Sequence, residues 1–420
     1  MNPLISTRPA TRAFSRSAPA IATAVATAVA TAITTAVATA ITTAVATASL
    51  CAIAWISACG GAAPRPIPPP EPARPPHAES PRSYAPLDTG AMRLTVFVAT
   101  TRRTTTSDRP GERFSGDDAD SLQFAAVGVN VPSYRARGVG ELPRPASVNS
   151  SFTTGNDPRR EFFVMSTIPT DSARFVQRIA SELATTRSRD VLVFVHGFNV
   201  SFEDAAVRAA QVAADMSFDG SIVVFSWPSA ASVTSYVRDM QAARNAGFHL
   251  LRLLRGIIPA TAPERVHLLA HSMGSEVVGK AAALVTTGDS AARFAQVILA
   301  APDIDARVFR RELLPVLVAH SQRVTLYASS DDDALRASRA VNGVWRLGLG
   351  GDSLTVVGGM DTIDATRVRA DALGHSLFGN ASFLSDLAAV IGEGKTPDER
   401  RLLAVKRGDL TFWRFRGDAR

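Results

Sequence analysis

A serine in a tight, glycine-containing turn is the feature of this sequence best suited to chemistry. An apolar run at residues 266–270 ends in Ala270-His271-Ser272-Met273-Gly274. Small residues two before and two after a serine, between a strand and a helix, are typical of a nucleophile elbow, a strained turn that lifts the hydroxyl above the sheet. The spacing therefore predicts that Ser272 is a nucleophile.

A second turn could stabilise the negative charge that forms in the same reaction. The apolar run at residues 191–195 ends in His196-Gly197-Phe198-Asn199. Such a turn offers a backbone N–H to the oxyanion that forms when a serine attacks a carbonyl group. We expect the two donors of this oxyanion hole to be the N–H groups of Phe198, or alternatively Asn199, and of Met273. His196 is expected to brace the turn.

A serine hydroxyl also needs a base to accept its proton, and histidine is the natural candidate. After an elbow serine, the usual chain order is acid and then histidine, which leaves the two histidines downstream of Ser272. His320 lies at a predicted helix end, whereas His375 lies in a Gly-His-Ser loop after the last predicted strand. We therefore expect His375 to be the base.

The acid that orients the histidine should follow a late strand. Asp331, Asp332 and Asp333 come directly after the apolar run at residues 324–328. We favour Asp332, because Asp331 or Asp333 is expected to cap the helix that follows. Asp331 stays an alternative acid, and so does Asp303, which follows the preceding strand.

The scaffold for these residues can be predicted from the order of the apolar runs. Strand-like runs alternate with helix-length patterns, which implies βαβ units and a mostly parallel central sheet with helices on both faces, an α/β fold. Chemistry gathers at the carboxyl ends of such strands, where both turns and the aspartates fall. We expect strands at 94–99, 122–131, 161–166, 191–195, 222–225, 266–270, 297–300, 324–328 and 354–357, and helices at 201–217, 232–258 and 272–285.

The N-terminal part of the chain has a different composition. Three arginines precede an Ala/Val/Thr/Ile stretch at residues 18–58 that contains a near-repeat and ends in Ile56-Ser57-Ala58-Cys59. This pattern resembles a bacterial lipoprotein signal, so residues 1–58 are expected to be cleaved and Cys59 to be lipidated. An uncleaved signal anchor stays open, because the stretch is long enough to span a bilayer. Ordinary secretory cleavage also stays open.

The remaining domain organisation follows from composition. A proline-rich tether is expected at residues 59–90, a globular domain at 91–392 and a basic C-terminal tail at 393–420. The two cysteines, Cys51 and Cys59, both lie in the leader, so the folded part has no thiol chemistry. Together these features predict an exported protein of the cell envelope that a lipid anchor holds at a membrane.

The net charge of +7 raises the question of a nucleic-acid partner. We expect none, because the basic residues are almost all arginines, scattered singly or in pairs rather than gathered in a stripe. The sequence has no H-E-x-x-H motif and no Cys/His cluster, and the glycines at 348–351 lack the lysine of a phosphate loop. No metal or cofactor is therefore expected.

Six short motifs together resemble a family of bacterial α/β-hydrolases, most of which are known only as hydrolases similar to lipases and esterases. The resemblance covers roughly residues 94–390. It implies the α/β-hydrolase fold, Ser272 as nucleophile and Asp332 as acid, and it implies no particular substrate. The motifs are Val195-His-Gly-Phe-Asn199, Phe225-Ser-Trp-Pro-Ser229, Ala270-His-Ser-Met-Gly274, Tyr327-Ala-Ser329, Asp361-Thr-Ile-Asp364 and Gly374-His-Ser376.

The sequence thus predicts hydrolysis of a small-molecule or lipid-like carboxylic ester by Ser272, His375 and Asp332 through an acyl-enzyme. Two alternatives stay open. A hydrolase fold does not guarantee hydrolysis, so the chain could be a non-catalytic, surface-tethered binding module, although the intact serine and histidine count against this. Hydrolysis of amide or peptidoglycan-linked substrates is the other.

Overall fold

The computed structural model describes residues 84–86, 90–133, 138–144, 156–285, 293–368, 371 and 373–416. The expected signal, Cys59 and most of the expected tether lie outside these residues. The chain divides into two units, residues 1–75 and 76–420, and every described residue belongs to the second. No helix of the described part has the length and apolar character needed to cross a membrane.

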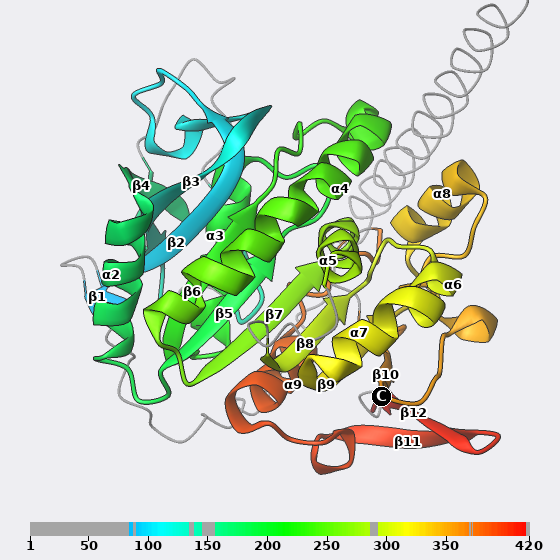
Figure 1. Ribbon diagram of the computed structural model, residues 1–420. Coiled ribbons are helices and arrows are strands. Elements are labelled where there is room, and N and C mark those ends of the chain that lie inside the picture. The colour runs from blue at the N-terminus through cyan, green and yellow to red at the C-terminus, as the bar shows by residue number, and fades with distance from the viewer. Residues whose placement is uncertain are drawn as a thin grey trace, which may run out of the picture. The chain divides into compact units, whose positions relative to one another are not determined.

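The described strands form one sheet of twelve members (Figure 1). They are β1 (Tyr84–Pro86), β2 (Met92–Thr104), β3 (Phe114–Val131), β4 (Phe163–Thr170), β5 (Asp190–Val195), β6 (Gly220–Ser226), β7 (Arg265–His271), β8 (Phe294–Ala300), β9 (Ser321–Ala328), β10 (Asp361–Asp364), β11 (Leu402–Arg407) and β12 (Leu410–Phe415). Their order is β11-β12-β10-β9-β8-β7-β5-β6-β2-β3-β4, with β1 paired to β2.

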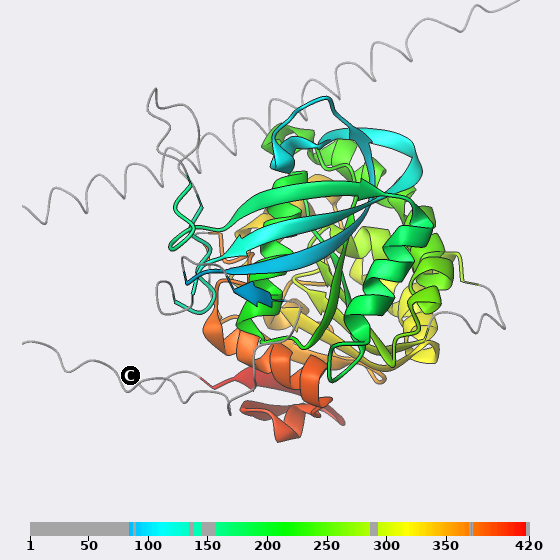
Figure 2. The same ribbon diagram turned by 90° about the vertical axis from the view of Figure 1, so that its left-hand side faces the viewer.

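The centre of the sheet is parallel and its two margins are antiparallel. All neighbours from β12 through to β2 run parallel. The pairs β11–β12, β2–β3, β3–β4 and β1–β2 are antiparallel. Figure 2 looks onto the margin that β2, β3 and β4 form. The prediction of a mostly parallel sheet is confirmed. The central strand β5 is buried at every position, which explains its unbroken apolar run.

Helices cover both faces of this sheet (Figures 1 and 2). One face carries α2 (Ser172–Leu183), α4 (Tyr236–Arg252), α5 (Gly274–Ala283) and α7 (Leu314–Ala319), and the other carries α3 (Phe202–Asp215) and α9 (Ala381–Glu393). In α2, residues four apart form the buried stripe. The remaining helices are α6 (Ala306–Val308), α8 (Asp333–Asn342), η1 (Pro110–Glu112), η2 (Val233–Ser235), η3 (Leu253–Ile257), η4 (Pro259–Thr261), η5 (Phe309–Leu313), η6 (Gly351–Ser353) and η7 (Pro397–Glu399).

The strand expected at residues 354–357 is wrong. These residues are extended but belong to no strand, and the ladder with β9 begins only at Asp361. The apolar run was misleading because only Leu354 of these four residues is fully buried, and a Gly358-Gly359 turn follows. The strand itself, β10, has aspartates at both ends and two fully buried residues, Thr362 and Ile363, between them.

The basic tail expected at residues 393–420 also needs correction. Within it, β11 and β12 form a hairpin, and β12 continues the sheet alongside β10. Phe412 and Phe415 are buried in the hydrophobic core, which a solvated tail would not allow. The interspersed arginine and lysine residues hid this alternation in the sequence.

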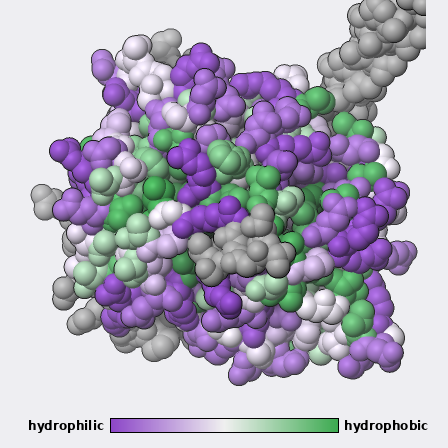
Figure 3. All heavy atoms as spheres, in the orientation of Figure 1, coloured by the Kyte–Doolittle hydropathy of each residue, from purple (hydrophilic) through white to green (hydrophobic). Residues whose placement is uncertain are grey.

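Several exposed arginines lie beside acidic side chains. On the face seen in Figure 1, hydrophilic and hydrophobic residues are intermixed (Figure 3). Exposed arginines often pair with nearby acids, as Arg238 does with Asp117 at 3.5 Å and Arg187 with Asp219 at 2.8 Å. Positive charge is therefore balanced locally in these places.

Candidate active site

Ser272 lies between β7 and α5 in a backbone conformation that serine rarely adopts. Its φ angle is +52°, in the left-handed region, which is strained for a residue with a side chain. The Ser272 N–H donates to the carbonyl of Ala300, and the Ser272 carbonyl accepts from the N–H groups of Ser275 and Asp303, each at 3.0 Å. The neighbouring strand and the elbow helix thus hold the strained turn.

Two glycines allow the two predicted turns to approach each other. A Cβ added at Gly274 would lie 2.6 Å from the carbonyl oxygens of both Val195 and His196. A Cβ added at Gly197 would lie 2.9 Å from the Cβ of Ser272. Since side chains do not pack this closely, only glycine permits the turn after β5 to lie against the elbow.

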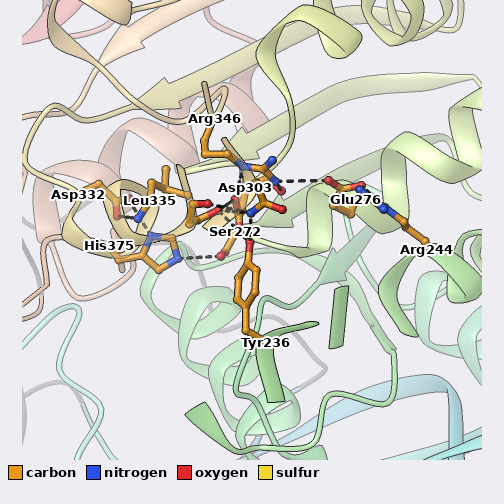
Figure 4. A network of polar contacts seen from close by, with 11 residues as sticks. Tyr236, Arg244, Ser272, Glu276, Asp303, Asp332, Leu335, Arg346 and His375 are labelled. Carbon is orange, nitrogen blue, oxygen red and sulfur yellow. Dashed lines mark hydrogen bonds and ion pairs between the residues drawn. The ribbon is translucent and has the colours of Figure 1, made fainter. Parts of the chain in front are cut away.

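His375 lies between Ser272 and Asp332 (Figure 4). Its Nε2 is 2.8 Å from the Ser272 Oγ, and its Nδ1 is 2.7 Å from the Asp332 Oδ2. Because an ionised carboxylate only accepts, Nδ1–H is the donor and Nε2 is free to accept the serine proton. The structure therefore brings together the three residues that the sequence indicated, in the geometry of a Ser-His-Asp triad.

The capping prediction for the neighbouring aspartates is wrong, because Asp332 itself caps α8. Its Oδ1 accepts the N–H of Leu335 at 2.8 Å, while the side chain is fully buried. Asp333 instead pairs with Arg336 at the surface, at 2.5 Å. One carboxylate thus serves both the helix and the histidine, a combination that was not predicted from the sequence.

The loop that carries His375 is fixed by Asp371. The two oxygens of this carboxylate accept the backbone N–H groups of His375 and Ser376, each at 2.9 Å. Gly374 has a φ of +65°, which allows the turn. The carbonyl of Leu373 accepts the N–H of Asp333, so the loop is also tied to the start of α8.

The pKa of His375 is raised above its usual range by its surroundings. Burial alone would lower this pKa, but the hydrogen bond and charge of Asp332 outweigh it, with further support from the charges of Asp303 and Asp371. The neighbouring ring of His271, 5.0 Å away between centroids, has a pKa lowered well below 6.5 by burial and by His375. His271 is therefore neutral beside the candidate base.

One of the two expected oxyanion donors directly follows Ser272, and the other directly follows Gly197, which lies against the elbow. Within the described part of the chain, neither the Phe198 N–H nor the Met273 N–H has a hydrogen-bond acceptor. Asn199, the alternative to Phe198, follows with a φ of +57°. The geometry leaves both amides available to an oxygen of a substrate.

His196 and Trp227 stabilise the turn that follows β5. Their rings stack at 5.1 Å, and the indole N–H of Trp227 donates to the His196 carbonyl at 2.7 Å. Burial and the nearby Arg102 lower the pKa of His196 to about 3, so the ring is neutral. Its Nδ1 donates to the Gly197 carbonyl at 2.9 Å. This arrangement agrees with the bracing role expected for His196.

Arg102, a fully buried residue on β2, was not predicted to take part in the site. Its guanidinium group donates to the carbonyls of Val200 at 2.7 Å and Ser229 at 2.9 Å, and to the Ser226 hydroxyl at 2.9 Å. Burial lowers the pKa of Arg102 to about 9, although Asp239 and Asp204 oppose this. Arg102 thus holds the far end of the oxyanion turn. An arginine next to another arginine, Arg103, carries no sequence signal that would distinguish this role.

Asp303, the alternative acid, lies near the site but is engaged elsewhere. Its carboxylate binds Tyr236, Ser338 and Arg346. Within the described residues no hydrogen bond joins it to His375. These residues also contain no group of three or more His, Cys, Asp or Glu side chains placed to hold a metal ion.

The sheet order and the elbow define an α/β hydrolase. A model of the family described as "Alpha/beta hydrolase of unknown function (DUF900)" matches residues 171–393, and the chain belongs to this family. The family resemblance and the fold predicted from it are therefore confirmed. The matched segment contains Phe198, Ser272, Asp332 and His375.

Solved structures of two other hydrolases show a distant likeness. A Trichoderma reesei cutinase in complex with a phosphonate inhibitor is 13% identical with a TM-score of 0.26, over 53% of this chain and 89% of that chain. Phospholipase PlaB from Legionella pneumophila in complex with thio-NAD is 15% identical with a TM-score of 0.27, over 53% and 66%. A search of curated proteins found no similar sequence.

Proposed function

We propose that this protein is a serine hydrolase that cleaves carboxylic esters through an acyl-enzyme. The observation that carries the proposal is the continuous hydrogen-bonded line from Asp332 through His375 to the Ser272 Oγ, at 2.7 and 2.8 Å. The strained elbow and membership of an α/β-hydrolase family support it.

In the acylation step, the Ser272 Oγ attacks the ester carbonyl carbon while His375 Nε2 accepts the hydroxyl proton. Asp332 stabilises the resulting imidazolium through Nδ1–H. The carbonyl oxygen becomes an oxyanion, which the N–H groups of Phe198 and Met273 stabilise; loss of one such donor typically costs about 2.7–4 kcal/mol. The tetrahedral intermediate then collapses, the C–O bond to the alcohol breaks, and the imidazolium protonates the departing alkoxide.

In the deacylation step, His375 accepts a proton from water, and the hydroxide attacks the acyl carbonyl of the ester to Ser272. Collapse of the second intermediate releases the carboxylic acid and returns the proton to Ser272. Esters are the proposed substrates because resonance between the nitrogen and the carbonyl group makes an amide less electrophilic than an ester, so the same residues cleave an ester more readily.

A fluorophosphonate probe tests the proposal directly. The full-length protein should be labelled on Ser272 and should hydrolyse p-nitrophenyl esters, and a series of acyl-chain lengths would define the acyl preference. Ser272→Ala should lose both activities while its melting temperature changes by only a few degrees. A folded wild-type protein that neither labels nor hydrolyses any ester would instead be a non-catalytic binding module.

We also propose that the hydrolase is held at a membrane of the cell envelope by lipid on Cys59. The basis is the sequence alone: arginines, an apolar stretch and Ile56-Ser57-Ala58-Cys59, followed by a proline-rich segment. Intact-mass analysis of membrane fractions should show loss of residues 1–58 and added acyl mass. Cys59→Ala should abolish the added acyl mass, and a mature protein without lipid would contradict the anchor.

A further inference from the structure

Asp303 lies in a buried polar network next to the elbow (Figure 4). Its Oδ1 accepts from the Ser338 hydroxyl and from the Arg346 Nε, both at 2.5 Å, and its Oδ2 accepts from the Tyr236 hydroxyl at 2.8 Å. Its backbone N–H donates to the Ser272 carbonyl at 3.0 Å. Asp303 is therefore joined both to the backbone of the candidate nucleophile and to three side chains from other segments.

Two of these side chains come from helices that contact other parts of the site. Ser338 lies on α8, the helix that Asp332 caps, so its bond to Asp303 fixes the helix from which the acid projects. Tyr236 begins α4, and its ring lies edge-on to Phe198 at 5.4 Å between centroids. Behind Phe198, Tyr236 therefore supports one of the two proposed oxyanion donors.

The third side chain extends the network to the elbow helix. Arg346 also donates to the Asp303 carbonyl at 2.6 Å and lies 3.4 Å from Glu276 on α5, which in turn lies 3.1 Å from Arg244 on α4. The Asp303 and Arg346 side chains are only 3% and 2% exposed. A buried ion pair adds little net stability to the fold, because the cost of desolvation offsets the attraction between the charges. Its position beside the site therefore needs an explanation other than stability.

We propose that Asp303 is a positioning residue. It fixes three parts of the site relative to one another: the Ser272 elbow, the helix that Asp332 caps, and Tyr236, which supports the oxyanion turn. The inference rests on the proposed roles of Ser272, Asp332 and His375. Asp303 itself does not touch the reacting atoms in this assignment. It acts through the Ser272 backbone, through Ser338 and through Tyr236.

The charge of Asp303 gives the proposal a readout that a purely structural role would lack. The charged groups that act on His375 are Asp332, Asp303 and Asp371, all of which raise its pKa, and the neutral His271 packs beside it. Replacing Asp303 by asparagine removes one negative charge, so the pKa of His375 should fall. The same change leaves a side chain of equal size.

The chain offers a matched control on the other face of the sheet. The Asp386 carboxylate accepts from the Tyr327 hydroxyl at 2.7 Å and from Arg400 at 3.1 Å, and all three residues are buried. This is the same combination of tyrosine, aspartate and arginine, without a hydrogen bond to Ser272 or His375. Asp386→Asn therefore reproduces the loss of a buried ion pair without the proposed positioning effect.

The experiment compares Asp303→Asn, Asp386→Asn and Tyr236→Phe in the full-length protein. One measurement is the rate of Ser272 labelling by a fluorophosphonate, and the other is the titration of the His375 imidazole followed by NMR. Asp303→Asn should slow labelling about 10- to 100-fold, as expected for a misplaced nucleophile, and move the titration to lower pH. Asp386→Asn should lower the melting temperature and change neither measurement.

Two results would overturn the proposal: wild-type labelling and titration in Asp303→Asn, or equal changes in Asp386→Asn. If Asp303→Asn does not fold, Tyr236→Phe decides, because it keeps the ring on Phe198 and removes only the hydroxyl, with its hydrogen bonds to Asp303, Ser338 and Asn342. Several-fold slower labelling supports positioning, and a wild-type rate refutes it. If the wild-type protein is not labelled at all, the proposed function fails, and the titration of His375 alone decides the role of Asp303.

Discussion

Asp332 holds His375 with one carboxylate oxygen and caps α8 with the other. The Oδ2 accepts the Nδ1–H of the imidazole at 2.7 Å, and the Oδ1 accepts the Leu335 N–H at 2.8 Å. The rigid start of a helix thus orients the carboxylate, and the carboxylate orients the ring. A substitution at Asp332 can separate these two effects.

Asp332→Asn should lower kcat by about 10⁴-fold, because the amide would favour the wrong imidazole tautomer. If the amide oxygen keeps the cap, the NH2 group faces Nδ1, and His375 must then carry its proton on Nε2 and cannot accept one from Ser272. The free energy of unfolding should change by no more than about 1 kcal/mol, because the cap remains. Ester hydrolysis and urea denaturation measure the two effects. Asp333→Asn, which alters only a surface pair, should keep full activity.

The dependence of activity on pH should reflect the raised pKa of His375. A raised pKa keeps His375 protonated to higher pH than usual, and the protonated imidazole cannot accept the Ser272 proton. The acid limb of kcat/KM should therefore show an apparent pKa above 6.5, with activity lost below it. The rate of p-nitrophenyl ester hydrolysis, measured between pH 5 and 9 in steps of about half a pH unit, tests this prediction. Melting temperatures recorded at each pH exclude unfolding as the cause. An acid limb below 6.5 would contradict the role of Asp332.

Gly197→Ala should lower kcat/KM by about 100-fold, because the new Cβ would meet the Ser272 Cβ at 2.9 Å and push the oxyanion turn away. Kinetics with a short-chain ester give the measurement. Gly392→Ala in α9 is the control: its Cβ would meet nothing within 4 Å, and a helical alanine should add about 0.5–1 kcal/mol of stability without affecting the rate. Wild-type kinetics in Gly197→Ala would show that the close approach is not needed.

Arg102→Lys should destabilise the protein and slow catalysis together. An ammonium group cannot replace a planar guanidinium that donates to Val200, Ser226 and Ser229 at once, so buried acceptors lose their donors. We expect a loss of about 2–4 kcal/mol in the free energy of unfolding. Chemical denaturation tests this against Arg103→Lys, an exposed neighbour that should be nearly neutral. Equal effects of the two substitutions would rule out the bracing role.

Short-range patterns account for the parts of the structure that the sequence predicted. The strands β5 and β7 are continuous apolar runs, and Ala270 and Gly274 are small because the elbow is crowded, so both features were visible in the residues themselves. The strand at residues 361–364 was missed because it has only two buried residues, Thr362 and Ile363, with an aspartate on either side. The hairpin of β11 and β12 was missed for a similar reason.

The networks around the site could not be predicted from local pattern. Asp303 and Arg346 are separated by 43 residues, and Arg102 and Ser229 by 127, so only the fold brings them together. Nothing adjacent to Asp303 in the sequence distinguishes it from an ordinary turn aspartate. A neighbour of Asp332 was predicted to be the helix cap for the same reason. No local sequence pattern indicates that one carboxylate binds two partners at once.

The antiparallel margins of the sheet have a practical consequence for anyone who trims the chain. A fragment cut to residues 171–393 would lose β2 from one side of β6 and β12 from one side of β10. The exposed flank of β6 would be an apolar strand with a row of unpaired N–H and C=O groups, which invites pairing with other molecules and aggregation. The strands that lie outside residues 171–393 therefore keep both flanks of the parallel sheet paired.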